Sequence, residues 1–347
     1  MRMLARSGWS LAATFAVTAC TSDGTTSPGT LPGTQTITVD ASQPFAYVAF
    51  GDPATVVNVT DASASTAWDV RLYATAVTLN GGAAGPGDVS GYCLCQNSGA
   101  TAAELRAMTP ASQLAAFEAV TASQVPASGQ FMADLLSPVI AGWYTGTAPA
   151  VTAAPSISWI LRRGTTATTL GKFRVTTIEN ATTAAAGSVT FEYALQGAPG
   201  GEFGPVTTRT VSVGAGVTYF DLTAGTVSSA TAWDLAFTGY TIRTNGGVSG
   251  AGGVMAVPDN ATPFAAIDAA YAATAPSQAY RADEFGGVFT TNRWYRYNLT
   301  GTDNQIWPTY DVYLLRKGSA VYKVQLTGYY GSNGAGRQVT LRYRRLK

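Results

Sequence analysis

Histidine is absent from the 347-residue chain, and this absence excludes several kinds of site at once. Histidine is the usual general base, proton shuttle and metal ligand of proteins. A Ser-His-Asp triad and a zinc centre with histidine ligands are therefore excluded. Charged residues are also scarce, at 12%, and the formal net charge of +1 argues against nucleic-acid binding, which needs a strong basic field. The chain has no apolar run of the ~18 residues that would span a bilayer.

Cysteine is rare, and the first of the three cysteines closes a leader that is typical of exported proteins. Arg2 and Arg6 precede a short apolar segment, and Val17-Thr18-Ala19-Cys20 follows it in the manner of a lipobox. The pattern predicts a lipoprotein signal peptide at residues 1–19, with a lipid attached to Cys20. An ordinary secretory signal with an incidental cysteine is the alternative.

The residues after Cys20 predict how the chain is displayed. Residues 20–35 are rich in Gly, Pro and Thr and have nothing to pack, which predicts a disordered tether. Thr21 follows the lipidated cysteine where an inner-membrane retention signal would have Asp. We therefore expect a protein held at the outer membrane or cell surface, in contact with the membrane through its lipid anchor only.

The residues that are abundant predict an all-β fold of mainly antiparallel strands with minor helices. Gly, Thr, Ala and Val dominate, as they do in short strands joined by tight turns. Apolar and polar residues alternate in many segments, as in Val339, Leu341 and Tyr343 against Thr340 and Arg342. Alternation with a period of two is typical of strands that bury one face.

A repeat predicts two tandem modules. Trp68-Asp69 is followed by Asn80-Gly81-Gly82, and Trp233-Asp234 by Asn245-Gly246-Gly247, with the same offset at both ends (233 − 68 = 165 and 245 − 80 = 165). We expect a first module at residues 36–196 and a second at residues 203–347, joined by a Gly- and Pro-rich linker.

Finer features of the modules are predicted from the spacing of apolar residues. The apolar parity switches after each Trp-Asp strand, which predicts a β-bulge or bend, with Gly239 at the switch. The second module is expected to have a helix capped by Thr262, with Phe264, Ile267 and Tyr271 on one face. The first is expected to have two short helices near Pro110 that turn Leu114 and Phe117 inward.

Cys93-Leu94-Cys95 follows the first Asn-Gly-Gly loop, and three interpretations stay open for it. The pair forms a local disulfide, provides two thiolate ligands, or remains as two free thiols. The oxidising compartment of an exported protein favours the disulfide. A metal site is disfavoured because zinc and iron–sulfur centres need four ligands, so no metal site is predicted.

These motifs resemble a known family. The second module has Trp233-Asp234, Asn245-Gly246-Gly247, Ser249-Gly250 and a closing Thr340-Leu341-Arg342-Tyr343, and the pattern is similar to that of the HmuY family of bacterial surface lipoproteins. The first module resembles the family more weakly. The resemblance implies an all-β, lipid-anchored protein that binds haem. The chain departs from the family pattern because it has two modules and lacks the two histidines that hold the iron in the founding member.

Candidate haem ligands are therefore sought among other residue types. Met255 follows the Gly-rich loop of the second module, and a thioether can bind haem iron. Tyr271 and Tyr280 could supply a phenolate. The plainer interpretation of all three is packing. The aromatic-dense segments Trp294-Tyr295-Arg296-Tyr297 and Trp143-Tyr144, with Trp307, could line a ligand cleft or a core.

Two classes of function remain after these exclusions. The leading hypothesis is a surface-anchored lipoprotein that binds haem or a related porphyrin for capture or transfer, with an outer-membrane haem receptor as a candidate partner. The alternative is a surface interaction module, for sugar or protein, that has lost the haem site. No pair of acid–base groups is evident, so we expect no enzyme activity.

Overall fold

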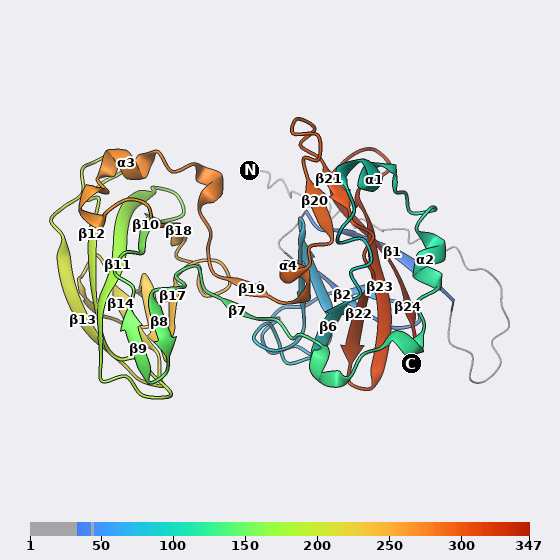
Figure 1. Ribbon diagram of the computed structural model, residues 1–347, viewed down its shortest axis with the longest axis horizontal. Helices are drawn as coiled ribbons and strands as arrows, with labels where there is room; N and C mark the ends of the chain where they lie inside the picture. Colours follow the sequence, from blue (N-terminus) through green and yellow to red (C-terminus); the bar gives the residue numbers. More distant parts are fainter. Residues whose placement is uncertain (1–32, 43–44) are drawn as a thin grey trace, which may run out of the picture.

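The chain folds into two β-rich lobes, as the ribbon diagram of the computed structural model shows (Figure 1). The structure describes residues 33–42 and 45–347. Its strands are short and antiparallel, which confirms the all-β prediction. The predicted signal peptide, Cys20 and most of the predicted tether lie outside the described residues. Gln35 is already part of the first strand, so a tether that extends to residue 35 is one residue too long.

Lobe A is the right-hand lobe of Figure 1 and comprises residues 33–134 and 287–347. One sheet has the order β1 (Gln35–Asp40), β24 (Gly336–Arg345), β23 (Ala320–Tyr330), β22 (Tyr313–Lys317) and β6 (Val89–Cys93). A second sheet has the order β3 (Thr55–Val57), β2 (Ala46–Ala49), β4 (Val70–Tyr73) and β5 (Ala76–Leu79). Apolar side chains from both sheets, such as Leu72 and Leu341, form one core between them.

Lobe B comprises residues 138–283 and has the same plan. One sheet has the order β13 (Thr207–Val213), β12 (Gly187–Leu195), β11 (Thr169–Glu179), β10 (Ser158–Arg163) and β18 (Met255–Asp259). The other has the order β15 (Thr226–Val227), β14 (Thr218–Asp221), β16 (Leu235–Thr238) and β17 (Thr241–Thr244). Phe191 and Phe237 meet in the core between the sheets.

The two predicted modules do not form one lobe each. In lobe A, β1 and β6 from the first module pair with β24 and β22 from the second. In lobe B, β12 and β10 from the first module pair with β13 and β18 from the second. The prediction of separate modules is therefore corrected: each lobe combines the amino-terminal half of one module with the carboxy-terminal half of the other. The two modules have similar strand patterns. The repeat therefore does not determine which amino-terminal half pairs with which carboxy-terminal half.

A two-stranded strap connects the lobes. Strands β7 (Leu135–Ser137) and β19 (Glu284–Gly286) run antiparallel across the waist between them (Figure 1). A buried aspartate stands before each strand. Asp134 Oδ2 accepts a hydrogen bond from Leu79 N at 2.7 Å in lobe A, and Asp283 Oδ1 accepts one from Val139 N at 3.0 Å in lobe B. These carboxylates fix the chain where it leaves each lobe.

The repeated motif is a hydrogen-bonded frame. Asn80 Nδ2 donates to the carbonyl of Trp68 at 2.7 Å, and Asn245 Nδ2 donates to that of Trp233 at 2.8 Å. The glycine two residues after each asparagine has a positive φ, 62° at Gly82 and 61° at Gly247, a backbone conformation that glycine adopts readily in turns. The spacing along the sequence between Trp-Asp and Asn-Gly-Gly is the same in both copies because the asparagine side chain bonds to the backbone of the tryptophan.

The aspartates of the motif join the halves of each lobe. Asp69 Oδ2 accepts a hydrogen bond from Phe50 N at 2.7 Å, and Lys317 Nζ lies 2.8 Å from Asp69 Oδ1. In lobe B the guanidinium of Arg163 donates to both oxygens of Asp234, at 2.9 and 2.8 Å. Each carboxylate comes from one module and each cation from the other. The motif therefore stabilises the lobe as well as the turn.

Two local predictions need correction. The parity switch is a β-hairpin and not a bulge, because β16 and β17 pair directly across the turn at Gly239 and Tyr240. The predicted helix capped by Thr262 is split into a 3-10 turn, Phe264–Ala266, and α3 (Ala269–Ala273), which is capped by Asp268. Tyr271 consequently faces solvent, whereas Phe264 and Ile267 are buried.

The remaining elements are short. The two helices of the first module are α1 (Ala102–Ala107) and α2 (Leu114–Glu118); Phe117 is buried as expected, but Leu114 is exposed. The others are α4 (Val288–Thr291), β8 (Tyr144–Thr147), β9 (Ala150–Ala153), β20 (Tyr295–Tyr297), β21 (Ile306–Pro308), and 3-10 turns at Ala122–Gln124, Ser128–Gln130 and Ser277–Ala279. Within the described part of the chain, no helix is long and apolar enough to cross a membrane.

Candidate functional site

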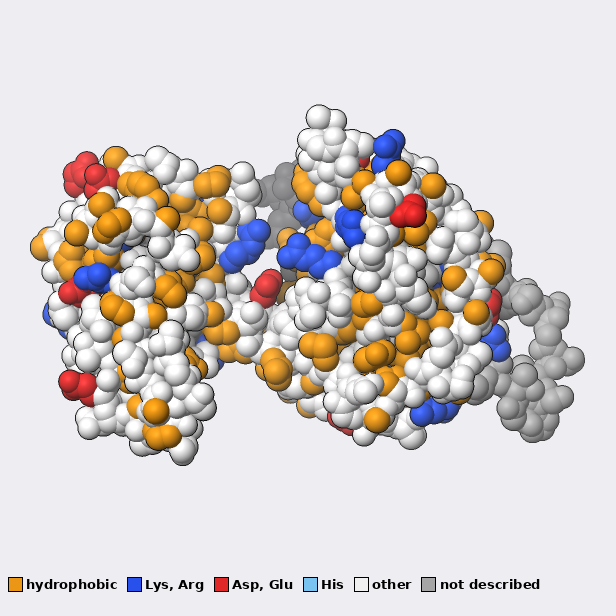
Figure 2. Space-filling model, in the orientation of Figure 1, with side chains coloured by type: hydrophobic (Ala, Val, Ile, Leu, Met, Phe, Trp, Pro, Cys, Tyr) orange, Lys and Arg blue, Asp and Glu red, His pale blue; other side chains and the backbone are white. Residues whose placement is uncertain are grey.

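A polar cleft opens on lobe A beside α4 and the β20–β21 hairpin. Its volume is about 960 Å³, which is within the range of small-molecule sites, roughly 300–1,000 Å³. Figure 2 shows Lys and Arg side chains gathered on the part of lobe A that faces the waist between the lobes. The cleft is lined by Cys95, Ser98, Thr290, Thr291, Asn292, Arg293, Tyr295, Arg296, Tyr297, Asn298, Leu299, Ile306, Thr309 and Asp311.

Both predicted modules contribute to this cleft. Cys95 and Ser98 come from the loop after β6, and the other lining residues come from the second module. The loop is held by hydrogen bonds from Asn97 N to Asp311 Oδ1 and from Asn97 Nδ2 to Thr309 O, both 2.8 Å. Arg296 Nη2 donates to Ser98 O at 3.0 Å across the cleft. The site therefore depends on the way the halves are combined in lobe A.

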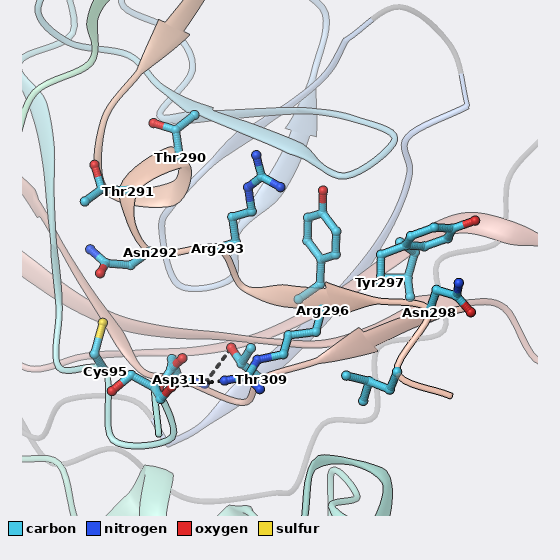
Figure 3. A pocket seen from close by; sticks show the side chains of 14 residues that line it. Cys95, Thr290, Thr291, Asn292, Arg293, Arg296, Tyr297, Asn298, Thr309 and Asp311 are labelled. Atoms are coloured by element: carbon cyan, nitrogen blue, oxygen red, sulfur yellow. Dashed lines mark hydrogen bonds between the residues drawn. The ribbon is translucent and has the colours of Figure 1, made fainter. Parts of the chain in front are cut away.

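The charged groups of the cleft are two arginines and one aspartate. Arg296 extends toward Thr309 and Asp311, whereas Arg293 points away from them, on the side of Thr290 (Figure 3). Burial raises the pKa of the Asp311 carboxyl, while the bond from Asn97 N lowers it. Two guanidinium groups against one carboxylate leave the lining with an excess of positive charge. The cleft is therefore suited to an anionic ligand.

The aromatic-dense segment of the second module divides between cleft and core. Tyr295 and Tyr297 line the cleft, as one of the two interpretations predicts. Trp294 is buried, with 1% of its surface exposed, and its indole N–H donates to Thr75 O at 2.9 Å. Trp307 is not among the lining residues; its indole N–H donates to Asp303 at 3.0 Å. Arg293 could not be predicted as a lining residue from the sequence, because a single arginine beside a tryptophan does not indicate a site.

The predicted haem ligands lie in lobe B, away from this cleft. Met255 is half-buried on β18, where Arg162 Nη2 lies 2.9 Å from its sulfur. Tyr280 is buried in the same cluster, with the Arg162 guanidinium 4.9 Å from its ring centre. Burial raises the pKa of the Tyr280 hydroxyl, which disfavours the phenolate that would bind iron. The structure thus brings Met255 and Tyr280 together, but in a packed cluster.

Tyr271 is separate from that cluster. It lies on α3 and is exposed; its hydroxyl donates to Asp259 Oδ2 at 2.7 Å and accepts from Thr262 at 2.6 Å. These bonds fasten α3 to the end of β18. Neither Met255, Tyr271 nor Tyr280 lines the lobe A cleft.

The cysteine pair of the first module forms a disulfide. Cys93 and Cys95 are joined, with their Cα atoms 5.0 Å apart, at the end of edge strand β6. Cys95 lines the cleft, so the bond shapes the start of the loop that carries Asn97 and Ser98. Among the described residues no group of three or more His, Cys, Asp or Glu side chains is arranged to hold a metal ion.

The structure is that of a β-rich protein with a polar cleft on lobe A. Comparison with known proteins adds one family: the model of the HmuY protein family matches residues 215–343. This segment contains β14 to β18 of lobe B, the strap strand β19, and α4 to β24 of lobe A. The match thus includes most of the cleft and spans both lobes.

Other comparisons add little. No curated protein matches the chain. A solved structure described as a "putative lipoprotein" from Bacteroides fragilis NCTC 9343 is similar at 19% sequence identity, over 37% of this chain and 80% of that one, with a TM-score of 0.15. A TM-score this low gives no structural support for a shared arrangement of the lobes.

Proposed function

We propose that the chain is a non-catalytic, surface-anchored lipoprotein that binds haem or a related porphyrin in the lobe A cleft, for capture or transfer. The observation that carries the proposal is the cleft itself, which has room for a small molecule and lies mostly within the segment that matches the HmuY family. Tyr295 and Tyr297 contribute aromatic rings to the lining, and Arg293 and Arg296 contribute positive charge.

The lipid anchor and the cellular location belong to the same proposal. Attachment through Cys20 would place the protein at the outer membrane or cell surface, where a haem-binding protein would meet its ligand and an outer-membrane haem receptor. A role without catalysis belongs to the same proposal and rests on the match of residues 215–343 to the HmuY family.

The donor atoms of the cleft favour one alternative, a surface module that binds sugar. The chain has no histidine, and neither a methionine nor a free thiol lines the cleft. Hydroxyl and amide groups of Thr290, Asn292 and Asn298 line it instead. Such groups with tyrosine rings suit a sugar as well as a porphyrin edge. Hemin binding separates the two functions.

Titration of hemin into residues 21–347, which retain all of β1, tests the proposal. We expect a Soret shift that saturates at one hemin per chain, because the cleft is in lobe A alone. Tyr297→Ala should weaken binding about two- to tenfold, the range expected for one aromatic contact. Met255→Ala should leave it unchanged.

Three results would contradict these expectations. No spectral change under either oxidising or reducing conditions would reject haem as the ligand and favour the sugar alternative. A large loss in Met255→Ala with none in Tyr297→Ala would move the site to lobe B. Saturation at two hemins per chain would show that lobe B has a site of its own.

A further inference from the structure

The two lobes differ at the segment that forms the cleft wall. Arg293-Trp294-Tyr295-Arg296-Tyr297-Asn298 in lobe A corresponds to Gly142-Trp143-Tyr144-Thr145-Gly146-Thr147 in lobe B (294 − 143 = 151). Both tryptophans are buried and both segments enter a short hairpin, β20–β21 or β8–β9. The two arginines and the second tyrosine are found in lobe A only. The tryptophan that both segments share is buried in each lobe, whereas the two arginines and the second tyrosine line the cleft.

The positive charges of the two arginines are available to a ligand. In the described part of the chain, Arg293 is exposed and makes no hydrogen bond or ion pair, and Arg296 donates to one backbone carbonyl, that of Ser98. Among the described residues, neither guanidinium has a carboxylate within ion-pair distance; the charge of Arg296 lowers the pKa of the Asp311 carboxyl, but Asp311 takes its hydrogen bond from Asn97 N. A guanidinium binds a carboxylate strongly through paired N–H donors. The wall can therefore accept ligand carboxylates.

The lining of the cleft has none of the imidazole, thioether or free thiol groups that most often hold haem iron. The sulfur of Cys95 is bound to Cys93. The Tyr297 hydroxyl donates to Asn304 Oδ1 at 2.7 Å, and the Tyr295 hydroxyl accepts from Thr75 at 3.3 Å. With no imidazole or thioether in the lining, the contacts on offer are ring faces, guanidinium groups and small polar groups.

We infer that lobe A recognises the carboxylates and the ring of a porphyrin, not its iron. The inference rests on the proposed function and narrows it. An iron-free porphyrin dicarboxylate binds the cleft about as well as haem does, because the arginine and tyrosine contacts are common to both. A porphyrin whose carboxylates are esterified loses the arginine contacts and binds weakly.

Three probes test this inference on residues 21–347: hemin, iron-free protoporphyrin IX and protoporphyrin IX dimethyl ester, each followed by quenching of protein fluorescence. The dissociation constants of the first two should agree within about threefold. The diester should bind about tenfold more weakly or worse, as expected for the loss of charge-assisted hydrogen bonds.

Variants locate the effect. Arg293→Gln, which breaks no hydrogen bond or ion pair among the described residues, and Arg296→Gln should each weaken hemin and protoporphyrin IX alike, by about three- to tenfold. Arg209→Gln is the matched control, since Arg209 also donates to a backbone carbonyl but lies on β13 of lobe B; it should change nothing. Melting temperatures of the variants report whether the fold is intact.

The outcomes separate this inference from the proposed function. Hemin binding without protoporphyrin IX binding would overturn the inference and leave haem binding standing. Equal affinity for the diester, or no effect of either arginine variant, would also overturn it. Failure of all three probes to bind would contradict the proposed function itself.

Discussion

Replacing Phe191 with alanine is expected to unfold lobe B and leave lobe A folded. Phe191 is fully buried, and its ring centre lies 5.1 Å from that of Phe220 and 5.5 Å from that of Phe237. The truncation of a buried phenylalanine costs about 3–5 kcal/mol, a large part of the stability of one domain. Phe191 belongs to the first predicted module, whereas Phe220 and Phe237 belong to the second.

Hydrogen exchange by mass spectrometry reads the result region by region. In Phe191→Ala, protection should fall throughout residues 138–283 and persist in β22 to β24. Leu341→Ala is the matched control, since Leu341 occupies the corresponding position in the core of lobe A (341 − 191 = 150) and should show the opposite pattern. Loss of protection confined to residues 36–196 in Phe191→Ala would show that the modules fold separately.

Asp69→Ala is expected to destabilise lobe A by about 2 kcal/mol, because it leaves the buried Phe50 N–H without an acceptor. The lost ion pair adds little, since the Lys317 side chain is 41% exposed and water can solvate the freed ammonium group. The loss of stability is measured by urea unfolding, monitored through hydrogen exchange in β2 and β22.

Two comparisons make the Asp69 result specific. Asp69→Asn keeps an acceptor oxygen for Phe50 N–H and should lose clearly less stability than Asp69→Ala. Asp234→Ala should shift the loss to lobe B, where Leu222 N donates to Asp234 Oδ2 at 2.9 Å. An unaltered unfolding midpoint in Asp69→Ala would show that the Asp69 carboxylate does not stabilise lobe A.

Strand-level structure could be predicted from the sequence because its signals are local. Alternating residues around Val339 and Leu341 identify a half-buried strand, and each Asn-Gly-Gly identifies the turn after another strand, β5 or β17. The hairpin at Gly239 was harder to predict, because a β-bulge and a two-residue turn both switch the apolar parity of the sequence. Asp268 is as good a helix cap as Thr262, so the helix start was ambiguous too.

The pairing of halves could not be predicted from the repeat. Arg163 and Lys317 are both cations, and Asp69 and Asp234 are both aspartates, so either combination of halves would form the same ion pairs. Packing distinguishes the combinations: Phe191 meets Phe237 in the core of lobe B, whereas Leu341, at the corresponding position, belongs to the core of lobe A. Side-chain fit of this kind is a property of the folded core and leaves no periodic signal.

The same uncertainty explains why the candidate site was only partly predicted. The sequence makes Met255 a candidate ligand because it follows the Gly-rich loop of the second module, which resembles the HmuY family more closely than the first. In the structure, that loop belongs to lobe B. The cleft forms in lobe A, where the loop after β6, with Cys95 and Ser98, meets the segment of Arg296 and Tyr297. Residues about 200 positions apart (296 − 98 = 198) were brought together by the pairing of halves, which the sequence left open.

Cleavage of the linker between the modules tests the combination of halves most directly. A protease site inserted between Pro199 and Gly200 lies in an exposed turn of the β12–β13 hairpin, where a cut leaves both strands in place. After cleavage, each fragment still supplies half of lobe A and half of lobe B. We expect one particle of undiminished size on gel filtration, which separates into two chains only in denaturant. Two folded fragments that separate without denaturant would contradict the account.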